Sequence, residues 1–411
     1  MLLLVNAHFA PDVAGSGQHL TDLAEHLSAA GMRVEVLTGS AAYDGGQLRA
    51  PASEGQGLLR VRRVAVPGFG RRRAAGRIIG YAVFLARALW VVCTRRGVGG
   101  VVVLTTPPLL PLVGWAGRAV RGRRYAVWSL DLHPEVEIAA GMLRPLGLAA
   151  RVLSWASDRA YRRADFVVDL GRHMRRRVLA KGVRESRAVS IPVWAVATQS
   201  PSLSAIRDMR ERLCVADKFV VMYAGNAGVV HDFGDLLAAM RSLREHDRVF
   251  FLFVGGGRRR AELEAGARDA GVRNFAYADY VSRADLGTML AVADAHVISL
   301  RASFAGISTP GKVYGALATG RPVMFVGPSE SEAADAVRQA PRGVVIDPGD
   351  GGATERIVET LRAWCDDDSS TAESRGLQLV GSDDGHGVDD RVARCREFEK
   401  LVRREWPWVA A

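Results

Sequence analysis

Three ionisable side chains follow one another closely in the stretch WSLDLHPE: Asp131, His133 and Glu135. A carboxylate at such a place can take up a proton or stabilise a developing positive charge. The apolar run Tyr125–Leu130 before them is typical of a buried strand, and Pro134 ends that strand. We therefore expect the group at the carboxyl edge of a parallel sheet, where reacting residues of α/β proteins gather. The alternative is a solvated loop in which Asp131 caps a helix.

A lysine occupies a second position suited to chemistry, Lys312 in the stretch STPGKVYGALATGRP. The chain has 51 arginines and four lysines, so a lysine here departs from its usual choice of cation. A flexible ammonium group in the first turn of a helix can reach a diphosphate, and free backbone amides lie beside it. Ser308 and Thr309 are predicted to cap this helix, with Pro310 at its first position. The alternative is a helix that only packs against the strand after it.

Two glycine-containing turns follow apolar strands at equivalent places in the two halves of the chain. The first carries Gly15, Ser16 and Gly17, and the second carries Gly225 and Asn226. A bare backbone before a helix lets a phosphate group approach free amides. The first turn is not a dinucleotide fingerprint, because a leucine stands at the third glycine position. Both turns are predicted to bind an anion, and the alternative for each is a loop without a ligand.

Short apolar runs and amphipathic runs alternate along the chain and must position these groups. The apolar runs that indicate strands are residues 2–6, 33–38, 58–66, 101–105, 125–130, 166–170, 188–191, 219–224, 249–254, 274–277, 296–300 and 323–326. Helical periodicity lies between most of them. Continuous apolar strands separated by helices indicate a parallel sheet that is covered on both faces. The predicted fold class is therefore α/β, with two doubly wound Rossmann-like domains that face a central cleft.

A stretch rich in proline, serine, threonine and alanine, Pro192–Ala205, separates the two halves. At 411 residues the chain is longer than one ordinary domain core. We predict one domain at 1–192 and a second at 206–385. We further predict a C-terminal helix at 386–411 that packs back toward the first domain.

The composition excludes several classes of protein. Four cysteines lie far apart, with neither a CxxC pair nor a histidine cluster, which argues against a disulfide framework and a structural metal site. The first residues lack a basic segment and indicate a strand rather than a signal peptide. The most apolar helix, Ile78–Thr94, has Arg87 in its middle and is short for a membrane span. We therefore expect a cytoplasmic protein without a transmembrane segment.

Positive charge is concentrated in the first half. Residues 1–190 contain 28 Lys+Arg and 13 Asp+Glu, a net charge of +15, whereas residues 191–411 contain 27 and 31, a net charge of −4. From Gly55 to Leu130 there are fourteen arginines and no lysine, aspartate or glutamate. Such asymmetry suggests an anionic partner, and the alternative is a generally arginine-rich protein with solvated faces.

Nucleic acid is disfavoured as that partner, because no recognised binding motif appears and aromatic residues are few. An arginine cluster beside an apolar helix suits an anionic membrane surface or a phosphate-bearing lipid better. The residues predicted to form this contact are Arg71, Arg72, Arg73 and Arg77.

Taken in order, these pieces resemble the retaining glycosyltransferases of family 4, and most closely the bacterial subgroup that builds surface polysaccharide and similar glycoconjugates. The similarity spans about residues 1–365 and rests on motifs from both halves. The motifs are HFAP…GSG and SLDLHPE in the first half, and YAGNAG, ADAHVISL, TPGKVYGALATGRP and VIDPGD in the second. Each motif alone is weak, whereas their order and spacing together are specific.

The resemblance implies a GT-B fold, with the acceptor on the first domain and a nucleotide-diphosphate sugar on the second. It also implies retention of anomeric configuration, with no essential metal ion and no cofactor besides the donor. The implied donor-binding residues are Gly15, Ser16, Gly17, Gly225, Asn226, Tyr280, Val281, Ser308, Thr309 and Lys312. Tyr280 and Val281 would lie near the base. Asp131, with Glu135 as second choice, would lie close to the reacting centre and act together with Lys312.

The chain departs from the family pattern at two carboxylates. The common form has two glutamates eight positions apart, the first touching the donor sugar and the second the ribose hydroxyls. Here those positions are Ile307 and Gly315, and Asn226 replaces an arginine often found near the start of the second domain. Either backbone groups replace these side chains in ribose recognition, or the site is impaired.

Three functions remain open at this point. The first is a glycosyltransferase whose acceptor is a sugar, a small molecule, or a lipid-linked or otherwise anionic substrate, with peripheral contact to the inner face of the cell membrane. The second is a nucleotide-sugar epimerase of the same architecture. The third is a non-catalytic homologue that acts as a partner of another enzyme.

Overall fold

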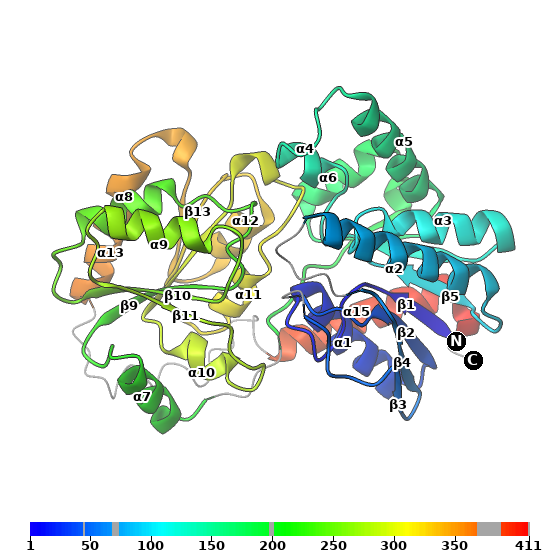
Figure 1. The fold of residues 1–411 in the computed structure, drawn as a ribbon, viewed down its shortest axis with the longest axis horizontal. Helices are drawn as coiled ribbons and strands as arrows, with labels where there is room; N and C mark the ends of the chain where they lie inside the picture. The colour runs from blue at the N-terminus through cyan, green and yellow to red at the C-terminus, as the bar shows by residue number, and fades with distance from the viewer. Residues whose placement is uncertain (44–45, 68–73, 197–200, 368–387, 410–411) are drawn as a thin grey trace. The chain divides into compact units, whose positions relative to one another are not determined.

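The computed structural model describes the chain except residues 44–45, 68–73, 197–200, 368–387 and 410–411 (Figure 1). It divides into two compact units. Unit 1 contains Met1–Val196, Gly306–Ser308 and Arg391–Ala411, and unit 2 contains Ala197–Ala305 and Thr309–Asp390. The sequence placed its divisions at 192, 206 and 386. Three residues from the second half, Gly306–Ser308, therefore belong to unit 1.

Unit 1 is built on an eight-stranded sheet with the order β3-β4-β2-β1-β5-β6-β7-β8. The strands are β1 (Leu2–Val5), β2 (Val34–Gly39), β3 (Ser53–Gln56), β4 (Leu59–Val64), β5 (Gly100–Val103), β6 (Tyr125–Trp128), β7 (Val167–Asp169) and β8 (Ala188–Ser190). All neighbours are parallel except β3 and β4. The order reverses between β1 and β5, both of them fully buried, so a topological switch point lies at their carboxyl ends.

Helices cover both faces of this sheet (Figure 1). They are α1 (Gly15–Ala29), α2 (Ala74–Thr94), α3 (Leu110–Arg121), α4 (Glu135–Ala139), α5 (Leu148–Arg163), α6 (Arg172–Ala180) and α15 (Val388–Glu405). Helices α2, α3 and α5 pack side by side on one face. Helix α15 packs through Phe398 against the ring of Trp128 at the end of β6. Apolar side chains on the inward faces of these helices thus close the first core.

Unit 2 is built on a six-stranded parallel sheet with the order β11-β10-β9-β12-β13-β14. The strands are β9 (Phe219–Ala224), β10 (Val249–Val254), β11 (Phe275–Ala278), β12 (Ala295–Ser299), β13 (Val323–Val326) and β14 (Gly343–Ile346). Numbered from β9, this is the 3-2-1-4-5-6 order of Rossmann domains, in which ligands bind where the order reverses. The reversal lies between β9 and β12, which are hydrogen-bonded neighbours.

The helices of unit 2 form a layer on each face of its sheet (Figure 1). They are α7 (Leu203–Arg212), α8 (Gly234–Ser242), α9 (Arg260–Asp269), α10 (Leu286–Ala291), α11 (Lys312–Leu317), α12 (Glu332–Gln339) and α13 (Ala353–Asp367). Residues of α8, α9 and α13 share one apolar core with the strands, and residues of α7 and α10 share a second. The predicted α/β class with two doubly wound domains is confirmed.

Two predicted helix starts differ from the structure, and strands β3 and β14 were not predicted. Helix α1 begins at Gly15, so Gly15 and Gly17 lie in the helix rather than in a turn before it. Helix α2 has 21 residues and begins at Ala74, earlier than the predicted start at Ile78, because small residues extend it. Strand β3 was not predicted, because all four of its residues are exposed and it lacks a buried face.

Candidate functional site

The switch point of unit 2 brings together groups from the ends of β9 and β12 and from α11. Lys312, the first residue of α11, reaches three of them with its ammonium group. It donates to the hydroxyl of Tyr223, to the backbone carbonyl of Asn226 (2.9 Å) and to Nε2 of His231 (3.2 Å). The ammonium nitrogen also lies 4.0 Å from the centre of the Tyr223 ring. All of these partners are neutral.

His231 is a residue of this candidate site that the sequence did not reveal. Its ring is buried, and Nδ1 donates to the carbonyl of Ser299, the last residue of β12 (2.5 Å). This bond fixes the tautomer with Nε2 free to accept from Lys312. Burial, then the nearby charge of Lys312, lowers the pKa of His231 well below its ordinary value. The imidazole is therefore a neutral hydrogen-bond acceptor. In the sequence His231 stands alone, outside any recognised motif, so the sequence gives no signal of this contact.

Lys312 has no counter-ion among the described residues. Burial lowers the pKa of Lys312 well below the ordinary lysine value. Among the described residues no aspartate or glutamate oxygen lies within ion-pair distance of its ammonium group. A cation desolvated in this way gains strongly from an arriving anion, because no internal carboxylate competes for it. This arrangement suits recognition of a phosphate oxygen.

Glycine backbones line the same switch point. Gly225 has φ of +123°, and a Cβ atom added there would lie 3.2 Å from Cε of Lys312. Gly255 and Gly257, after β10, have φ of +122° and +130°, and added Cβ atoms would come within 2.5 Å of backbone atoms of Gly225 and Ala227. Only glycine fits these positions. The two loops therefore pack backbone against backbone, and the second loop was not predicted.

The remaining predicted donor residues of unit 2 have distinct surroundings. Tyr280 is partly exposed, and its ring packs against Gly255 and Gly256. Val281 packs against the apolar core between the sheet and α10. Asn226 contributes its backbone carbonyl to Lys312. Tyr280 and the carbonyl of Asn226 thus lie at the glycine loops. Val281 instead packs into the apolar core.

The predicted capping of α11 by Ser308 and Thr309 is wrong. The residue before the helix is Gly311, and no side chain caps it, because the turn at Pro310–Gly311 separates both residues from the first helical turn. Ser308 pairs instead with Asp131 as an isolated β-bridge in unit 1. The hydroxyl of Thr309 is buried and has no partner among the described residues.

The two positions that lack the family glutamates differ in their surroundings. Ile307 is buried in unit 1, where its carbonyl accepts from the amide of Leu132 (2.9 Å). Gly315, in α11, is partly exposed, and a Cβ atom there would meet only Leu290 at 3.6 Å. Close packing therefore does not require glycine at 315.

Asp131 lies where it was predicted, directly after β6 at the carboxyl edge of the unit 1 sheet. Its backbone amide donates to the hydroxyl of Thr105 (3.1 Å), which follows β5. Within the described residues its carboxylate makes no hydrogen bond or ion pair. The alternative of a helix cap is not observed, since α4 begins only at Glu135 after Pro134.

His133 and Glu135 are both engaged by neighbours in unit 1. Nδ1 of His133 lies 2.8 Å from the carboxylate of Glu137, one turn later. Burial would raise the pKa of Glu137, but the hydrogen bond and charge of His133 bring it below its ordinary value. Glu135 forms an ion pair with buried Lys181, which also lies 3.4 Å from Asp158. Asp131 is therefore the carboxylate of this motif that remains available.

A buried histidine–aspartate pair lies beside the first glycine stretch of unit 1. The sequence did not predict this pair. Nδ1 of His8 lies 2.6 Å from the carboxylate of Asp12, and both residues are buried. A Cβ atom on Gly17 would come within 3.0 Å of the backbone of His8, so α1 requires glycine there to approach β1. Ser16 lies 3.4 Å from the amide of Asn6, and nothing crowds Gly15.

Some of the predicted residues lie outside the described chain. Arg71, Arg72 and Arg73 lie outside the described residues, as does the side chain of Arg77. Within the described residues no cluster of three or more histidine, cysteine, aspartate or glutamate side chains could hold a metal ion. No described helix is long and apolar enough to span a membrane.

Comparison with known proteins places these sites in a family context. Residues 14–194 match the family described as "Glycosyl transferase 4-like domain", and residues 218–366 match "Glycosyl transferases group 1". The chain is 25% identical to a probable glycosyltransferase, WbjE, of Pseudomonas aeruginosa, over 68% of this chain and 70% of the relative. It is 23% identical to a putative colanic acid biosynthesis glycosyl transferase, WcaI, of Escherichia coli, over 78% and 81%.

Several solved structures have a similar fold. A sucrose-phosphate synthase of Thermosynechococcus elongatus has a TM-score of 0.69 at 17% identity, with 98% of both chains covered. HepE of Anabaena, solved with UDP-glucose, has a TM-score of 0.68 at 15% identity, covering 97% of this chain and 99% of its own. WaaG, involved in lipopolysaccharide biosynthesis, has a TM-score of 0.63 at 17% identity, covering 98% and 99%.

Proposed function

Because the chain belongs to the family 4 glycosyltransferases with the GT-B fold, we propose that it transfers a sugar from a nucleotide-diphosphate donor to an acceptor with retention of configuration. The observation that carries the proposal is Lys312, a desolvated cation held by neutral groups at the switch point of a Rossmann domain. Such a group is suited to neutralise the diphosphate of a donor. The diphosphate of the donor would then act as the counter-ion that Lys312 lacks among the described residues.

The proposed chemistry needs no metal ion. When the bond between the anomeric carbon and the diphosphate oxygen breaks, negative charge grows on the leaving oxygen. The preorganised ammonium group of Lys312 stabilises that charge. The backbone at Gly225 can also come close to the diphosphate, because glycine has no side chain there. The nucleophilic hydroxyl enters on the face that the diphosphate leaves, and the leaving oxygen takes its proton. Retention follows from attack on that face.

Asp131 is the proposed carboxylate at the reacting centre. It follows β6 at the carboxyl edge of the sheet, and its carboxylate is free of ion pairs within the described residues. A fixed negative charge there would stabilise the positive charge that develops on the sugar ring. Glu135 is less suited to this role, because Lys181 already neutralises it.

The donor is proposed to be a nucleoside-diphosphate sugar, in line with the UDP-glucose bound to the structurally similar HepE. The proposed acceptor is a lipid-linked or otherwise anionic substrate, because the arginine-rich first unit would bind it. The relative WcaI, described as a putative colanic acid biosynthesis glycosyl transferase, is consistent with an acceptor in polysaccharide biosynthesis. We further propose a cytoplasmic location, since all four cysteines are free thiols.

Thermal denaturation with a panel of nucleoside diphosphates tests the donor proposal. A ligand that binds only the native state raises the melting temperature. We expect at least one nucleoside diphosphate to stabilise the wild type and not Lys312→Ala. Lys218→Ala is the matched control, because its ammonium group contacts only a surface carbonyl, that of Asp247. An equal rise in melting temperature for all three proteins would show that Lys312 does not contribute to nucleotide binding.

Turnover of the donor tests the reaction itself. We expect Lys312→Ala to slow release of the nucleoside diphosphate by about a hundredfold or more while circular dichroism stays unchanged. Conversion of the donor sugar to its epimer without any acceptor would identify an epimerase instead. If the wild type binds none of the nucleoside diphosphates, a non-catalytic partner protein would be favoured.

A further inference from the structure

One face of unit 1 exposes an unusual number of large apolar side chains. Ten of the fifteen exposed large hydrophobic residues in the described chain lie on α2, on α3, or between Met142 and Trp155. The most prominent are Ile78, Trp90, Leu146, Leu148, Val152 and Trp155. Leu146 and Leu148 are 88% and 78% exposed. Isolated exposed apolar residues are normal, but a group of this size marks an interaction surface.

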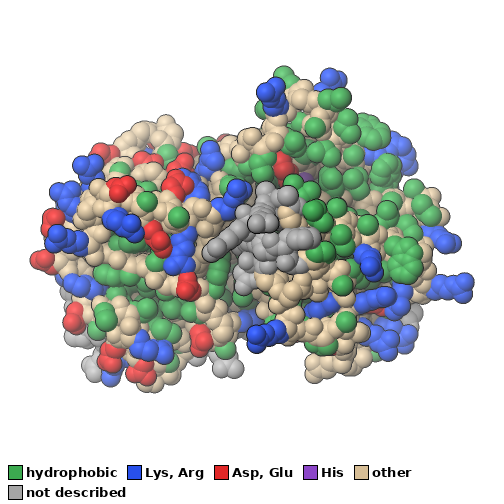
Figure 2. All heavy atoms as spheres, viewed as in Figure 1, with side chains coloured by type: hydrophobic (Ala, Val, Ile, Leu, Met, Phe, Trp, Pro, Cys, Tyr) green, Lys and Arg blue, Asp and Glu red, His purple; other side chains and the backbone are tan. Residues whose placement is uncertain are grey.

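These side chains form one continuous face because their helices are neighbours. Helix α3 packs against α2 on one side and α5 on the other. Figure 2 shows hydrophobic side chains gathered over the region of these three helices. We call this the α2–α5 face. It belongs to unit 1 alone, so its composition does not depend on unit 2.

The charged residues of the α2–α5 face have one sign. Residues 74–94, 110–121 and 141–157 contain six arginines and no aspartate or glutamate. Arg87, Arg121, Arg144 and Arg151 are exposed. Asp158, the first acidic residue after this stretch in α5, lies 3.4 Å from the ammonium group of Lys181. An acidic partner surface, and not a basic one, fits such a face.

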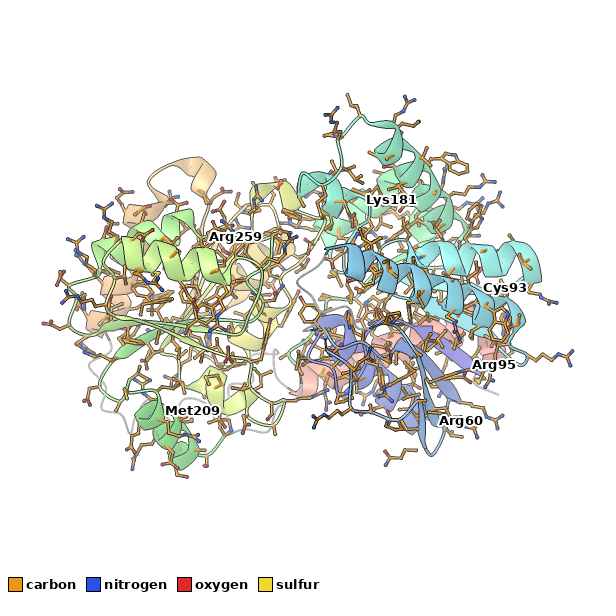
Figure 3. The ribbon with its side chains drawn as sticks, viewed as in Figure 1. Arg60, Cys93, Arg95, Lys181, Met209 and Arg259 are labelled. Atoms are coloured by element: carbon orange, nitrogen blue, oxygen red, sulfur yellow. The ribbon has the colours of Figure 1, made fainter. Side chains whose placement is uncertain are left out.

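A basic cavity lies at the end of the same face. Arg95 and Arg96 follow α2 directly and line, with Arg33 and Arg60, a cavity of about 580 Å³ (Figure 3). Glu35 in its wall is paired with Arg95. A cavity of this volume lined by four arginines suits a phosphate group. Arginine side chains bind phosphate oxygens through two parallel hydrogen bonds.

We propose that the α2–α5 face is a docking surface for an anionic lipid bilayer. Its apolar side chains enter the interfacial region, its two exposed tryptophans lie at the level of the headgroups, and its arginines bind lipid phosphates. Long arginine side chains can bury their stems and keep their charge at the headgroups. The surface holds unit 1 at the bilayer without a spanning helix.

A second copy of the chain fits this face poorly. In a symmetric pair the same patch meets itself, so the arginines of one copy would oppose those of the other. A soluble protein partner would need an acidic surface that also offers a broad apolar centre. A bilayer with anionic headgroups provides both features over any area. The charge pattern therefore favours the lipid surface.

Docking to the membrane does not depend on the proposed transfer reaction. Only the idea that docking brings the enzyme to a lipid-linked acceptor rests on that reaction. Flotation of the full chain with vesicles of equal parts phosphatidylcholine and phosphatidylglycerol tests docking. We expect the wild type to float with these vesicles and not with pure phosphatidylcholine, because each arginine near an anionic surface adds to binding. Equal flotation with both vesicles would overturn the charge assignment.

Variants on the face identify it as the surface used. We expect the triple variant Trp90→Gln, Leu148→Gln and Trp155→Gln to weaken partitioning by about tenfold or more. We expect the double variant Arg87→Gln and Arg151→Gln to weaken it by about tenfold. The control is Leu203→Gln with Arg207→Gln on α7, which removes one exposed apolar and one exposed basic residue from unit 2.

Three results would overturn the proposal. The first is wild-type partitioning by both face variants. The second is an equal loss in the control. The third is a wild-type dimer in sedimentation that the triple variant abolishes, which would make the face an interface between copies. Donor turnover, measured without vesicles, should remain at the wild-type rate in both face variants, so a defect in docking is distinguishable from a failure of the proposed function.

Discussion

Lys312 enters the switch point of unit 2 from α11, and within the described chain it hydrogen-bonds only to uncharged groups. Burial without a counter-ion favours the neutral amine, so the free protein gives up this proton at a lower pH than other lysines do. A bound diphosphate reverses that shift, because its charge favours the ammonium form. Binding of the donor and protonation of Lys312 are therefore coupled.

The coupling predicts how nucleotide affinity depends on pH. Affinity for a nucleoside diphosphate should be constant below the depressed pKa of Lys312 and fall as pH rises through it, because the amine must then take up a proton to bind. Isothermal titration calorimetry in two buffers of different ionisation enthalpy measures both the affinity and the proton uptake. Lys312→Arg, which keeps its charge, should show no proton uptake at alkaline pH. Identical proton uptake in both proteins would contradict the assignment.

Individual residues of this site were predictable only in part. Lys312 was singled out because lysine is rare in the chain and this one lies in the first turn of a predicted helix, which is a signal in the sequence itself. His231 was missed, because its role depends on the carbonyl of Ser299, 68 residues away. The pair of His8 and Asp12 was missed although the spacing is short, because nothing in the local pattern indicates burial. Long-range partners and burial are properties of the fold.

At the scale of elements, an ion-pair cluster joins three helices of unit 1. Lys181, just after α6, is buried and pairs with Glu135 at the start of α4 and with Asp158 of α5. Burial, more than any other cause, raises the pKa of Asp158, although Lys181 opposes the shift. The three elements therefore depend on one cation for their charge balance.

Removing that cation should loosen the three helices. We expect Lys181→Met to lower the free energy of unfolding by about 2 kcal/mol, less than for a fully buried pair because both carboxylates are partly exposed. Urea denaturation measures the change. Adding Glu135→Gln to Lys181→Met should restore part of the loss, since it removes one of the two unpaired charges. No recovery in the double variant would show that Glu135 does not contribute through Lys181.

Elements were predicted well where burial is continuous and poorly where it is not. The strands β1, β9 and β10 follow directly from apolar runs that are buried on both faces. Strand β3 has no buried residue, so only its hydrogen bonds to β4 define it. The cap of α11 was predicted from residue type, but the turn at Pro310–Gly311 shifts the helix start to Lys312. Local composition does not determine such a turn.

At the scale of the whole molecule, the chain leaves unit 1 and later returns to complete it. Residues Arg391–Ala411 belong to unit 1, although Ala197–Asp390 lie almost entirely in unit 2. Trp406 in this returning segment is fully buried, and its indole nitrogen donates to Asp165 (3.2 Å). Its ring occupies the space beside Gly100, where an added Cβ atom would lie 2.5 Å away. The first core is thus incomplete until the end of the chain is in place.

The returning segment should therefore set the stability of unit 1. We expect Trp406→Ala to lower the free energy of unfolding by about 3–5 kcal/mol, because it opens a large cavity beside β5 and leaves Asp165 without one donor. Trp408→Ala is the matched control, since its ring is 47% exposed, and should cost about 1 kcal/mol or less. Urea unfolding followed by circular dichroism compares the two. Similar losses in both variants would mean that Trp406 does not close the core, and that the end of the chain is attached to unit 1 without completing its core.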